Sequence, residues 1–221
     1  MSTTGLIDSS KSRQFSLLAQ LVGGKMIDAI DVFKAFQPHR GDAIVTTSGT
    51  VGSHWANVST KPNRDLRLGS SMGQTVSAAF GVALGLPEEQ MVLFDSEGAL
   101  LMNLGALASI AGKAPKNFYH FLLDNEMYAT TGGQPVPNAA NIDYAGMAKS
   151  VGYASTHHFT DLEELVTRIG EIMKEEGPVF ISIKINPEVQ NLPMALRERS
   201  GGRSRIETIR NFQKEFDIAS V

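Results

Sequence analysis

The stretch MVLFDSEGALLMNLG, residues 91–105, contains the clearest change of structural pattern in this chain. Its first four residues are bulky and apolar, which is typical of a buried strand. A turn of small and acidic residues follows, and it contains Asp95 and Glu97. Residues 99–111 are then apolar nearly all round, which predicts a helix covered on both sides. A strand that leads through a short turn into a helix is the repeating unit of an α/β fold.

The same alternation extends in both directions from this unit. It predicts a three-layer α/β/α fold with a mostly parallel central sheet, in which ligands sit at the carboxyl ends of the strands. We expect an N-terminal helical extension over residues 1–40, the α/β domain over 41–186, and a basic helical tail over 187–221. Further strands are predicted at residues 43–47, 66–68, 118–123, 154–159 and 179–185, and further helices at 11–36, 73–86, 142–151 and 161–175.

The composition excludes several classes of protein. The chain has 221 residues, a formal charge of −3 and no cysteine, so disulfides, thiolate-bound zinc, iron–sulfur clusters and cysteine nucleophiles are ruled out. No basic excess is available to bind a nucleic-acid backbone. The start of the chain has no signal-peptide pattern, and no apolar run reaches about 18 residues, so we expect a cytoplasmic protein without a membrane partner.

Acidic and amide side chains follow two of the predicted strands. Glu97 lies in the turn after one strand, and Asn125 lies just after the next strand along the chain. Oxygen ligands of this kind suit Mg²⁺, and the amino end of the helix after Glu97 suits a diphosphate. A surface turn whose acids only cap a helix explains the same residues equally well. Both interpretations stay open at this point.

Several short motifs, taken together, favour the ligand site. The residues SEG (96–98) stand where thiamine diphosphate (ThDP) enzymes have Gly-Asp-Gly, and Asn125 stands where that family's motif ends. The intervening LMNLG (101–105) is similar to the decarboxylase branch of the family. The stretches TTGGQ (130–134) and GSSMG (69–73) also have counterparts there. The chain therefore resembles the diphosphate-binding domain of ThDP enzymes, and in particular the ThDP-binding subunit of sulfopyruvate and phosphonopyruvate decarboxylases.

The resemblance implies a ThDP-binding fold and a set of site residues. Mg²⁺ would be held by Glu97, Asn125 and the backbone carbonyl of Met127. His54 and Gln134 are the candidates for contact with substrate or for proton transfer. The residues expected to bind the cofactor are Ser70, Ser71, Met72, Gly98, Ala99, Asn103 and Tyr128.

Two positions depart from the family pattern. Glu97 replaces an Asp, and its carboxylate reaches further by roughly one C–C bond, about 1.5 Å. Mg²⁺ requires short, octahedral contacts, so the turn must shift to compensate. Asp95 is a rival metal ligand, and Ser96 replaces a Gly. These departures keep open a cofactor-free regulatory or degenerate homologue.

The resemblance also implies a partner. ThDP chemistry needs a Glu that activates the pyrimidine ring, and the family carries it on a separate pyrimidine-binding domain. The flanking segments here are too short for such a domain. We therefore expect a second subunit, and a heteromeric 2-oxoacid decarboxylase or related carboligase acting on a small anionic 2-oxoacid. A β-type subunit of a 2-oxoacid:ferredoxin oxidoreductase is less favoured, because those chains commonly carry cysteines.

Overall fold

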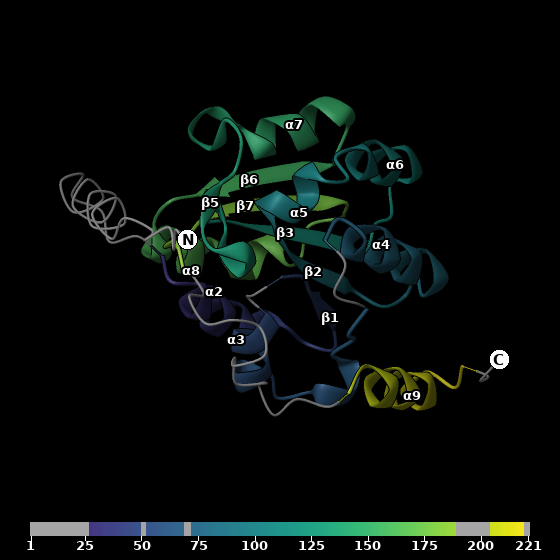
Figure 1. The fold of residues 1–221 in the computed structure, drawn as a ribbon. Coiled ribbons are helices and arrows are strands. Elements are labelled where there is room, and N and C mark those ends of the chain that lie inside the picture. Colours follow the sequence, from purple (N-terminus) through teal and green to yellow (C-terminus); the bar gives the residue numbers. More distant parts are fainter. Residues whose placement is uncertain (1–26, 50–51, 69–71, 189–203, 219–221) are drawn as a thin grey trace, which may run out of the picture.

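A computed structural model of the chain describes residues 27–49, 52–68, 72–188 and 204–218. Five parallel strands form the central sheet in the order β1-β2-β3-β7-β6 (Figure 1). A short antiparallel hairpin joins β4 (Met127–Tyr128) to β5 (Gln134–Pro135). The strands of the central sheet are β1 (Ile44–Thr47), β2 (Met91–Ser96), β3 (Phe118–Asp124), β6 (Ser155–Phe159) and β7 (Val179–Lys184).

Helices cover both faces of this sheet. On one face lie α2 (Ala29–Phe36), α3 (Gly52–Val58) and α8 (Leu162–Ile172). The other face is covered by α4 (Thr75–Gly85), α5 (Glu97–Leu101), α6 (Gly105–Lys113), α7 (Tyr144–Val151) and the C-terminal α9 (Arg205–Glu215). Short 3₁₀ turns occur at Gln37–His39, Pro62–Arg64, Ala129–Thr131 and Ala139–Asn141. The predicted three-layer α/β/α fold is confirmed.

Alternation along the buried strands creates two separate cores. All seven residues of β3 are buried, as expected for a strand with both faces covered. Phe121 and Leu123 point into the core beneath α2 and α8, whereas Phe118 and Leu122 point into the core beneath α4 and α7. Because successive side chains point to opposite faces, one apolar run supplies both layers.

Local side-chain signals set the ends of several helices. Asp161 accepts a hydrogen bond from the Glu164 N–H at 2.9 Å and caps α8. Asp143 does the same for α7 through the Gly146 N–H at 2.8 Å. Gly152 ends α7 with a φ of 105°, a conformation that favours glycine.

Two predicted elements were wrong. Residues 66–68 form no strand, because only a single bridge between Asp65 and Val45 continues the pairing there. The helix predicted over 99–111 is two helices, α5 and α6, which are separated by a turn at 102–104. The Asn103 amide donates to the Gly73 carbonyl at 2.8 Å and to Ser77 Oγ at 3.0 Å, which anchors this turn to the neighbouring loop.

The segments at the two ends of the chain are only partly described. The helical pattern over 11–36 appears as α2, and residues 11–26 lie outside the described part. Helix α2 buries Val32, Phe33 and Phe36 in the same core as the sheet. Within the described ranges, no helix is both long enough and apolar enough to cross a membrane.

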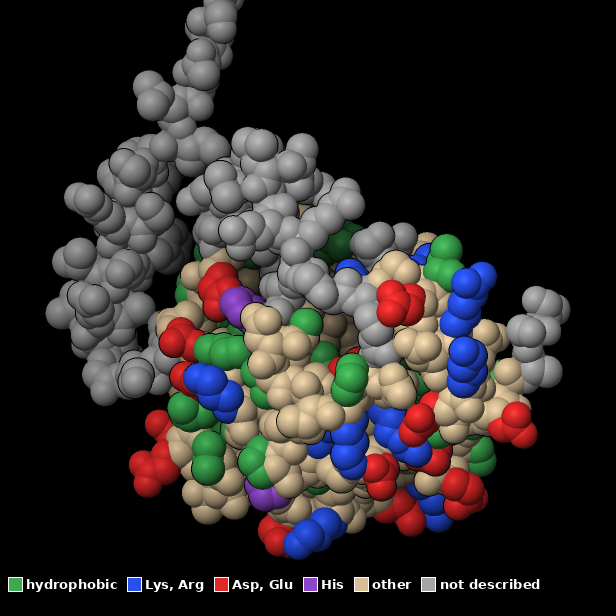
Figure 2. All heavy atoms as spheres, turned by 90° about the horizontal axis from the view of Figure 1, so that it is seen from below, with side chains coloured by type: hydrophobic (Ala, Val, Ile, Leu, Met, Phe, Trp, Pro, Cys, Tyr) green, Lys and Arg blue, Asp and Glu red, His purple; other side chains and the backbone are tan. Residues whose placement is uncertain are grey.

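Charged side chains of both signs are interspersed on the face shown in Figure 2. Near Pro62–Arg64, Lys61 pairs with Asp42 at 2.6 Å, and Arg64 pairs with Glu89 at 2.7 Å. Arg64 also lies over the Phe216 ring, with its guanidinium carbon 4.8 Å from the ring centre. Arg64 also pairs with Glu215 at 3.3 Å, so its contacts join the C-terminal end of helix α9 to the body of the fold.

The aromatic cluster around Phe94 generates a stability prediction. Phe94 is fully buried, and its ring centre lies 4.8 Å from that of Phe33 and 4.8 Å from that of Phe121. We expect Phe94→Ala to lower the free energy of unfolding by about 3–5 kcal/mol, because it leaves a cavity at the centre of this core. Urea denaturation measures the change. The control Val166→Ala, at a side chain that is half exposed on α8, should change it by less than about 0.5 kcal/mol. Equal effects of the two substitutions would contradict the assignment of Phe94 to the core.

Candidate functional site at the strand ends

Parallel pairing of β2 with β3 brings two predicted ligands together. The register pairs Ser96 with Leu123, so the residues that follow both strands emerge at the same edge of the sheet. The Asn125 N–H donates to Glu97 Oε2 at 3.4 Å. Glu97 is completely buried and Asn125 is nearly so. The Glu97 carboxyl group and the backbone of Asn125 therefore meet at this edge, and both residues are shielded from bulk water.

The buried Glu97 carboxyl group has few partners that replace its lost hydration. Among the described residues its Oε1 has no hydrogen-bond partner. Burial, with the nearby charge of Asp124 as the next cause, raises the pKa of Glu97 to about 8, although backbone N–H groups of the site oppose the shift. In the absence of a cation this carboxyl is therefore largely neutral at pH 7. Such an environment stabilises the carboxylate form only when a positive charge is supplied.

The loop after β3 is held in place from both sides. Asn125 Oδ1 accepts from the Met127 N–H at 3.1 Å, and Asp124 Oδ1 accepts from the Glu126 N–H at 3.2 Å. Lys184, the last residue of β7, donates to Asp124 Oδ2 at 3.0 Å and to Glu126 Oε1 at 2.5 Å. Burial alone would lower the pKa of Lys184, but these two acids raise it. The loop that carries the predicted amide and carbonyl ligands is therefore anchored by a permanent cation.

These donors fit a hard divalent cation. Glu97 Oε1 is unpaired, and an amide oxygen accepts one hydrogen bond while keeping a second lone pair. No group of three or more His, Asp or Glu side chains is arranged for a metal in the described part of the chain. The predicted ligand set contains one carboxylate, one amide and one backbone carbonyl. Asp95, the rival ligand, already accepts from Ser48 Oγ and from the Ser96 N–H.

The first turn of α5 lies beneath an aromatic ring. Gly98 and Ala99 are buried there, and a Cβ on Gly98 would lie 2.6 Å from Cε1 of Tyr128. Only glycine therefore lets the Tyr128 ring approach this turn so closely. The side chain of Asn103 holds the Gly73 loop rather than facing open space.

The remaining predicted site residues are dispersed. Met72 is partly exposed, and Ser70 and Ser71 lie outside the described residues. His54, on α3, contacts Glu188 Oε2 through Nε2 at 2.8 Å. Gln134 is exposed and exchanges hydrogen bonds with Thr131. In the part of the chain that the structure describes, neither side chain shares a hydrogen bond with Glu97 or Asn125.

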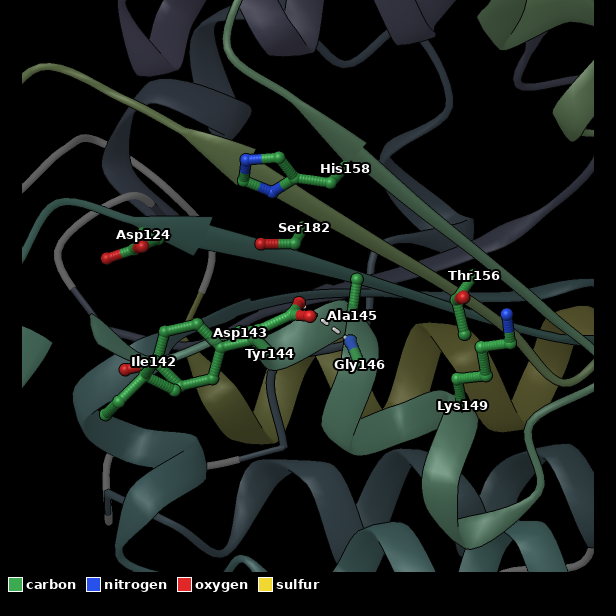
Figure 3. A pocket seen from close by; sticks show the side chains of 10 residues that line it. All are labelled: Asp124, Ile142, Asp143, Tyr144, Ala145, Gly146, Lys149, Thr156, His158 and Ser182. Carbon is green, nitrogen blue, oxygen red and sulfur yellow. Dashed lines mark hydrogen bonds between the residues drawn. The ribbon is translucent and has the colours of Figure 1, made fainter. Parts of the chain in front are cut away.

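A cavity of about 470 Å³ adjoins the site on the α7 side of the sheet (Figure 3). Asp124 and Tyr144 lie at one end of it, and Lys149 and Thr156 lie at the other. The Tyr144 hydroxyl is buried without a partner among the described residues. Burial and the charges of Asp124 and Glu97 raise the pKa of Tyr144. Neither Glu97 nor Asn125 lines this cavity, so it is a neighbour of the strand-end site rather than its centre.

Sequence reasoning missed three contributors to this region, namely Asp124, Tyr144 and Lys184. One signal was available for Lys184, because it is the one charged residue of the strand β7. For Tyr144 the sequence carries no signal, since an aromatic residue in the first turn of a helix is usually a core residue.

Comparisons with known proteins agree with this geometry. The family "Thiamine pyrophosphate enzyme, C-terminal TPP binding domain" matches residues 47–183. Phosphonopyruvate decarboxylase of Streptomyces hygroscopicus is 32% identical over 145 residues, which are 66% of this chain and 35% of that protein. The chain thus spans about one third of the length of this relative.

A second relative is matched over most of its length. Sulfopyruvate decarboxylase subunit beta of Methanothermobacter thermautotrophicus is 31% identical over 153 residues, which are 69% of this chain and 78% of that subunit. Among solved structures, benzoylformate decarboxylase of Polynucleobacter necessarius superposes with a TM-score of 0.60 at 18% identity. The superposition covers 74% of this chain and 33% of that one, and it supports the fold.

The raised pKa of Glu97 generates a pH prediction for the metal-free chain. The unfolded carboxyl ionises near 4.5 and the folded one near 8. The folded state therefore binds one more proton between these values, and stability is fully present below pH 4.5 and is lost as pH rises towards 8. Each tenfold change in an ionisation constant corresponds to about 1.4 kcal/mol, so the loss is on the order of 3–5 kcal/mol.

Urea unfolding of wild type and Glu97→Gln, at about pH 5 and about pH 8, isolates this contribution, because the glutamine does not titrate. We expect the stability of wild type relative to Glu97→Gln to fall between the two pH values. A difference that stays constant would show that Glu97 titrates normally.

Proposed function

This chain belongs to the thiamine pyrophosphate enzyme family through its C-terminal TPP-binding domain, and from this premise we propose that it binds ThDP (thiamine pyrophosphate) together with Mg²⁺ as one subunit of a heteromeric 2-oxoacid decarboxylase or related carboligase. The observation that carries the proposal is the buried meeting of Glu97 with Asn125 at adjacent strand ends. The relatives named phosphonopyruvate and sulfopyruvate decarboxylases support the reaction class.

In this proposal Mg²⁺ is held by Glu97, Asn125 and the backbone carbonyl of Met127. A divalent cation would supply the charge that the buried Glu97 carboxylate needs, and the cation would in turn neutralise a diphosphate. Glutamate is a hard oxygen ligand like aspartate, so its presence at position 97 preserves the required chemistry. The loop anchored by Lys184 fixes the other two ligands before any cation binds.

The diphosphate would lie against the first turn of α5. Backbone N–H groups in the first turn of a helix have no partner within the helix, and those of Gly98 and Ala99 lie next to Glu97. This support is local, because α5 has only five residues and its dipole is correspondingly short. Tyr128 would shield the turn from water. We assign Ser70, Ser71, Met72 and Asn103 to the remainder of the cofactor surface.

When bound, ThDP supplies the electron sink that accepts the electron pair left as CO₂ departs from a 2-oxoacid. The chain's own residues hold and orient the cofactor and keep the site dry. We assign His54 and Gln134 to the substrate side, with Glu188 orienting the His54 ring.

The pyrimidine-activating Glu is proposed to come from a partner subunit. The name of the sulfopyruvate relative, subunit beta, supports a heteromeric assembly. A cofactor-free homologue is the second candidate, and one observation favours it. Without a cation, the Glu97 carboxyl is largely protonated at neutral pH, which opposes metal capture.

Binding of Mg²⁺ and ThDP to the native complex tests the proposal. The chain is tagged and purified from its own source with its partners, stripped by chelation, and titrated with Mg²⁺ and ThDP in a calorimeter. We expect wild type to bind, Glu97→Gln to weaken Mg²⁺-dependent ThDP binding at least tenfold, and Glu97→Asp to retain it, because the charge is kept.

Glu163→Gln, on the first turn of the distant helix α8, is the matched control and should bind like wild type. Wild-type complex that contains a partner but binds no ThDP would refute the proposal and favour the cofactor-free homologue.

A further inference from the structure

A line of buried polar side chains runs beneath the site and crosses three strands. Ser48 Oγ donates to Asp95 Oδ1, and Asp95 Oδ2 lies 3.4 Å from Nε2 of His120. His120 Nδ1 lies 3.4 Å from the hydroxyl of Tyr153. The four residues are at most 6% exposed. Ser48 follows β1, Asp95 lies near the end of β2, His120 lies within β3 and Tyr153 follows α7, so the line connects four separate elements.

These polar groups occupy positions where the fold otherwise places apolar side chains. His120 lies between Phe118 and Phe180, whose ring centres are 6.0 and 4.9 Å from its own. Burying polar groups is unfavourable unless they pair with each other. Among the described residues, His120 Nε2 and Asp95 Oδ2 have no hydrogen-bond partner, and the two atoms face each other at 3.4 Å. Each of these two buried groups therefore depends on the other for electrostatic compensation.

The contacts around His120 and Asp95 orient these side chains towards one another. Burial, and next the charge of Asp95, raise the pKa of Tyr153, so its hydroxyl keeps its proton and is available as a donor to His120 Nδ1. The other ring nitrogen of His120, Nε2, faces Asp95 Oδ2 at 3.4 Å. Asp95 Oδ1 accepts hydrogen bonds from Ser48 Oγ and from the N–H of Ser96 at 3.0 Å.

The last of these donors links the line to the site. Ser96 directly precedes Glu97, and its N–H is held by Asp95 in the turn between β2 and α5. From the other side, Ser48 ties this turn to the end of β1, where its own N–H donates to the Phe94 carbonyl at 2.8 Å. Rotation of the turn would break both contacts at Asp95.

We propose that Ser48, Asp95, His120 and Tyr153 form a positioning network that fixes the turn between β2 and α5 and so directs Glu97 towards Asn125. Asp95 is a positioning residue in this network and not a metal ligand. The network orients Glu97 in the metal-free chain, and only the effect of this orientation on Mg²⁺ binding rests on the proposed function.

Amide hydrogen exchange of the metal-free chain, resolved by NMR, tests the positioning network directly. Ser48→Ala and Tyr153→Phe should accelerate exchange at residues 96–98 by about tenfold relative to other buried amides, because an opened turn exposes them. Ser48→Thr keeps the hydroxyl and should restore slow exchange.

Tyr119→Phe is the matched control. Tyr119 lies next to His120 in β3 but points to the opposite face, where its hydroxyl donates to the Glu175 carbonyl at 2.6 Å. It should lose general stability without selective acceleration at residues 96–98. Equal exchange at residues 96–98 in Ser48→Ala, Tyr153→Phe and Tyr119→Phe would overturn the proposal.

A second measurement follows Mg²⁺-dependent ThDP binding in native complexes that carry Ser48→Ala, Asp95→Asn or Tyr119→Phe. Ser48→Ala and Asp95→Asn should each weaken Mg²⁺-dependent ThDP binding by about three- to tenfold, while Tyr119→Phe leaves it unchanged. Loss of all binding in Asp95→Asn, with Ser48→Ala like wild type, would instead identify Asp95 as a ligand and overturn the network. If wild type itself binds no cofactor, the proposed function fails, whereas the exchange measurement still decides the positioning network.

Discussion

The parallel pairing of β2 with β3 is the constraint on which the rest of this structure depends. Adjacent parallel strands end at the same edge of the sheet, so the residues that follow β2 and β3 lie close together. Glu97 and Asn125 meet for this reason, although they are far apart in the chain. The aromatic packing around Phe94 and Phe121 keeps the two strands in register from one face, and the apolar residues beneath α4 and α7 do so from the other.

Some buried polar groups in this fold have hydrogen-bond or ion-pair partners, and others lack them among the described residues. Lys184 satisfies Asp124 and Glu126, and Asp95 Oδ1 accepts from Ser48 Oγ and from the Ser96 N–H. Glu97 alone combines complete burial, an unpaired oxygen and a strongly raised pKa among the acids that the structure describes. A fold tolerates such an unfavourable group where a ligand supplies the missing interaction. The burial of Glu97 is therefore the physical link between the fold and the proposed cofactor chemistry.

Sequence patterns predicted the strands of the sheet well because β2, β3 and β7 are short, mainly apolar runs bounded by turn residues. They failed where tertiary contacts decided the outcome. The apolar pattern of residues 99–111 is continuous, yet the chain breaks at Asn103, whose amide binds the Gly73 loop. Residues 66–68 have strand-like composition but find pairing only at Asp65. In the first case a contact with a segment distant in sequence overrides the local preference, and in the second the pairing does not continue beyond one bridge.

The sequence by itself determined the α/β class, the order of the strands along the chain and the motifs that identify the family. These follow from local periodicity and from residue identity, both of which are written in the chain. Only the tertiary structure decided that Asp95 turns towards Ser48 and His120, that Tyr144 and Asp124 line one cavity and that Lys184 anchors the loop after β3. The physical reason is that the orientation and burial of a side chain depend on which segments pack together. No local sequence pattern encodes the neighbours that a side chain meets across the sheet.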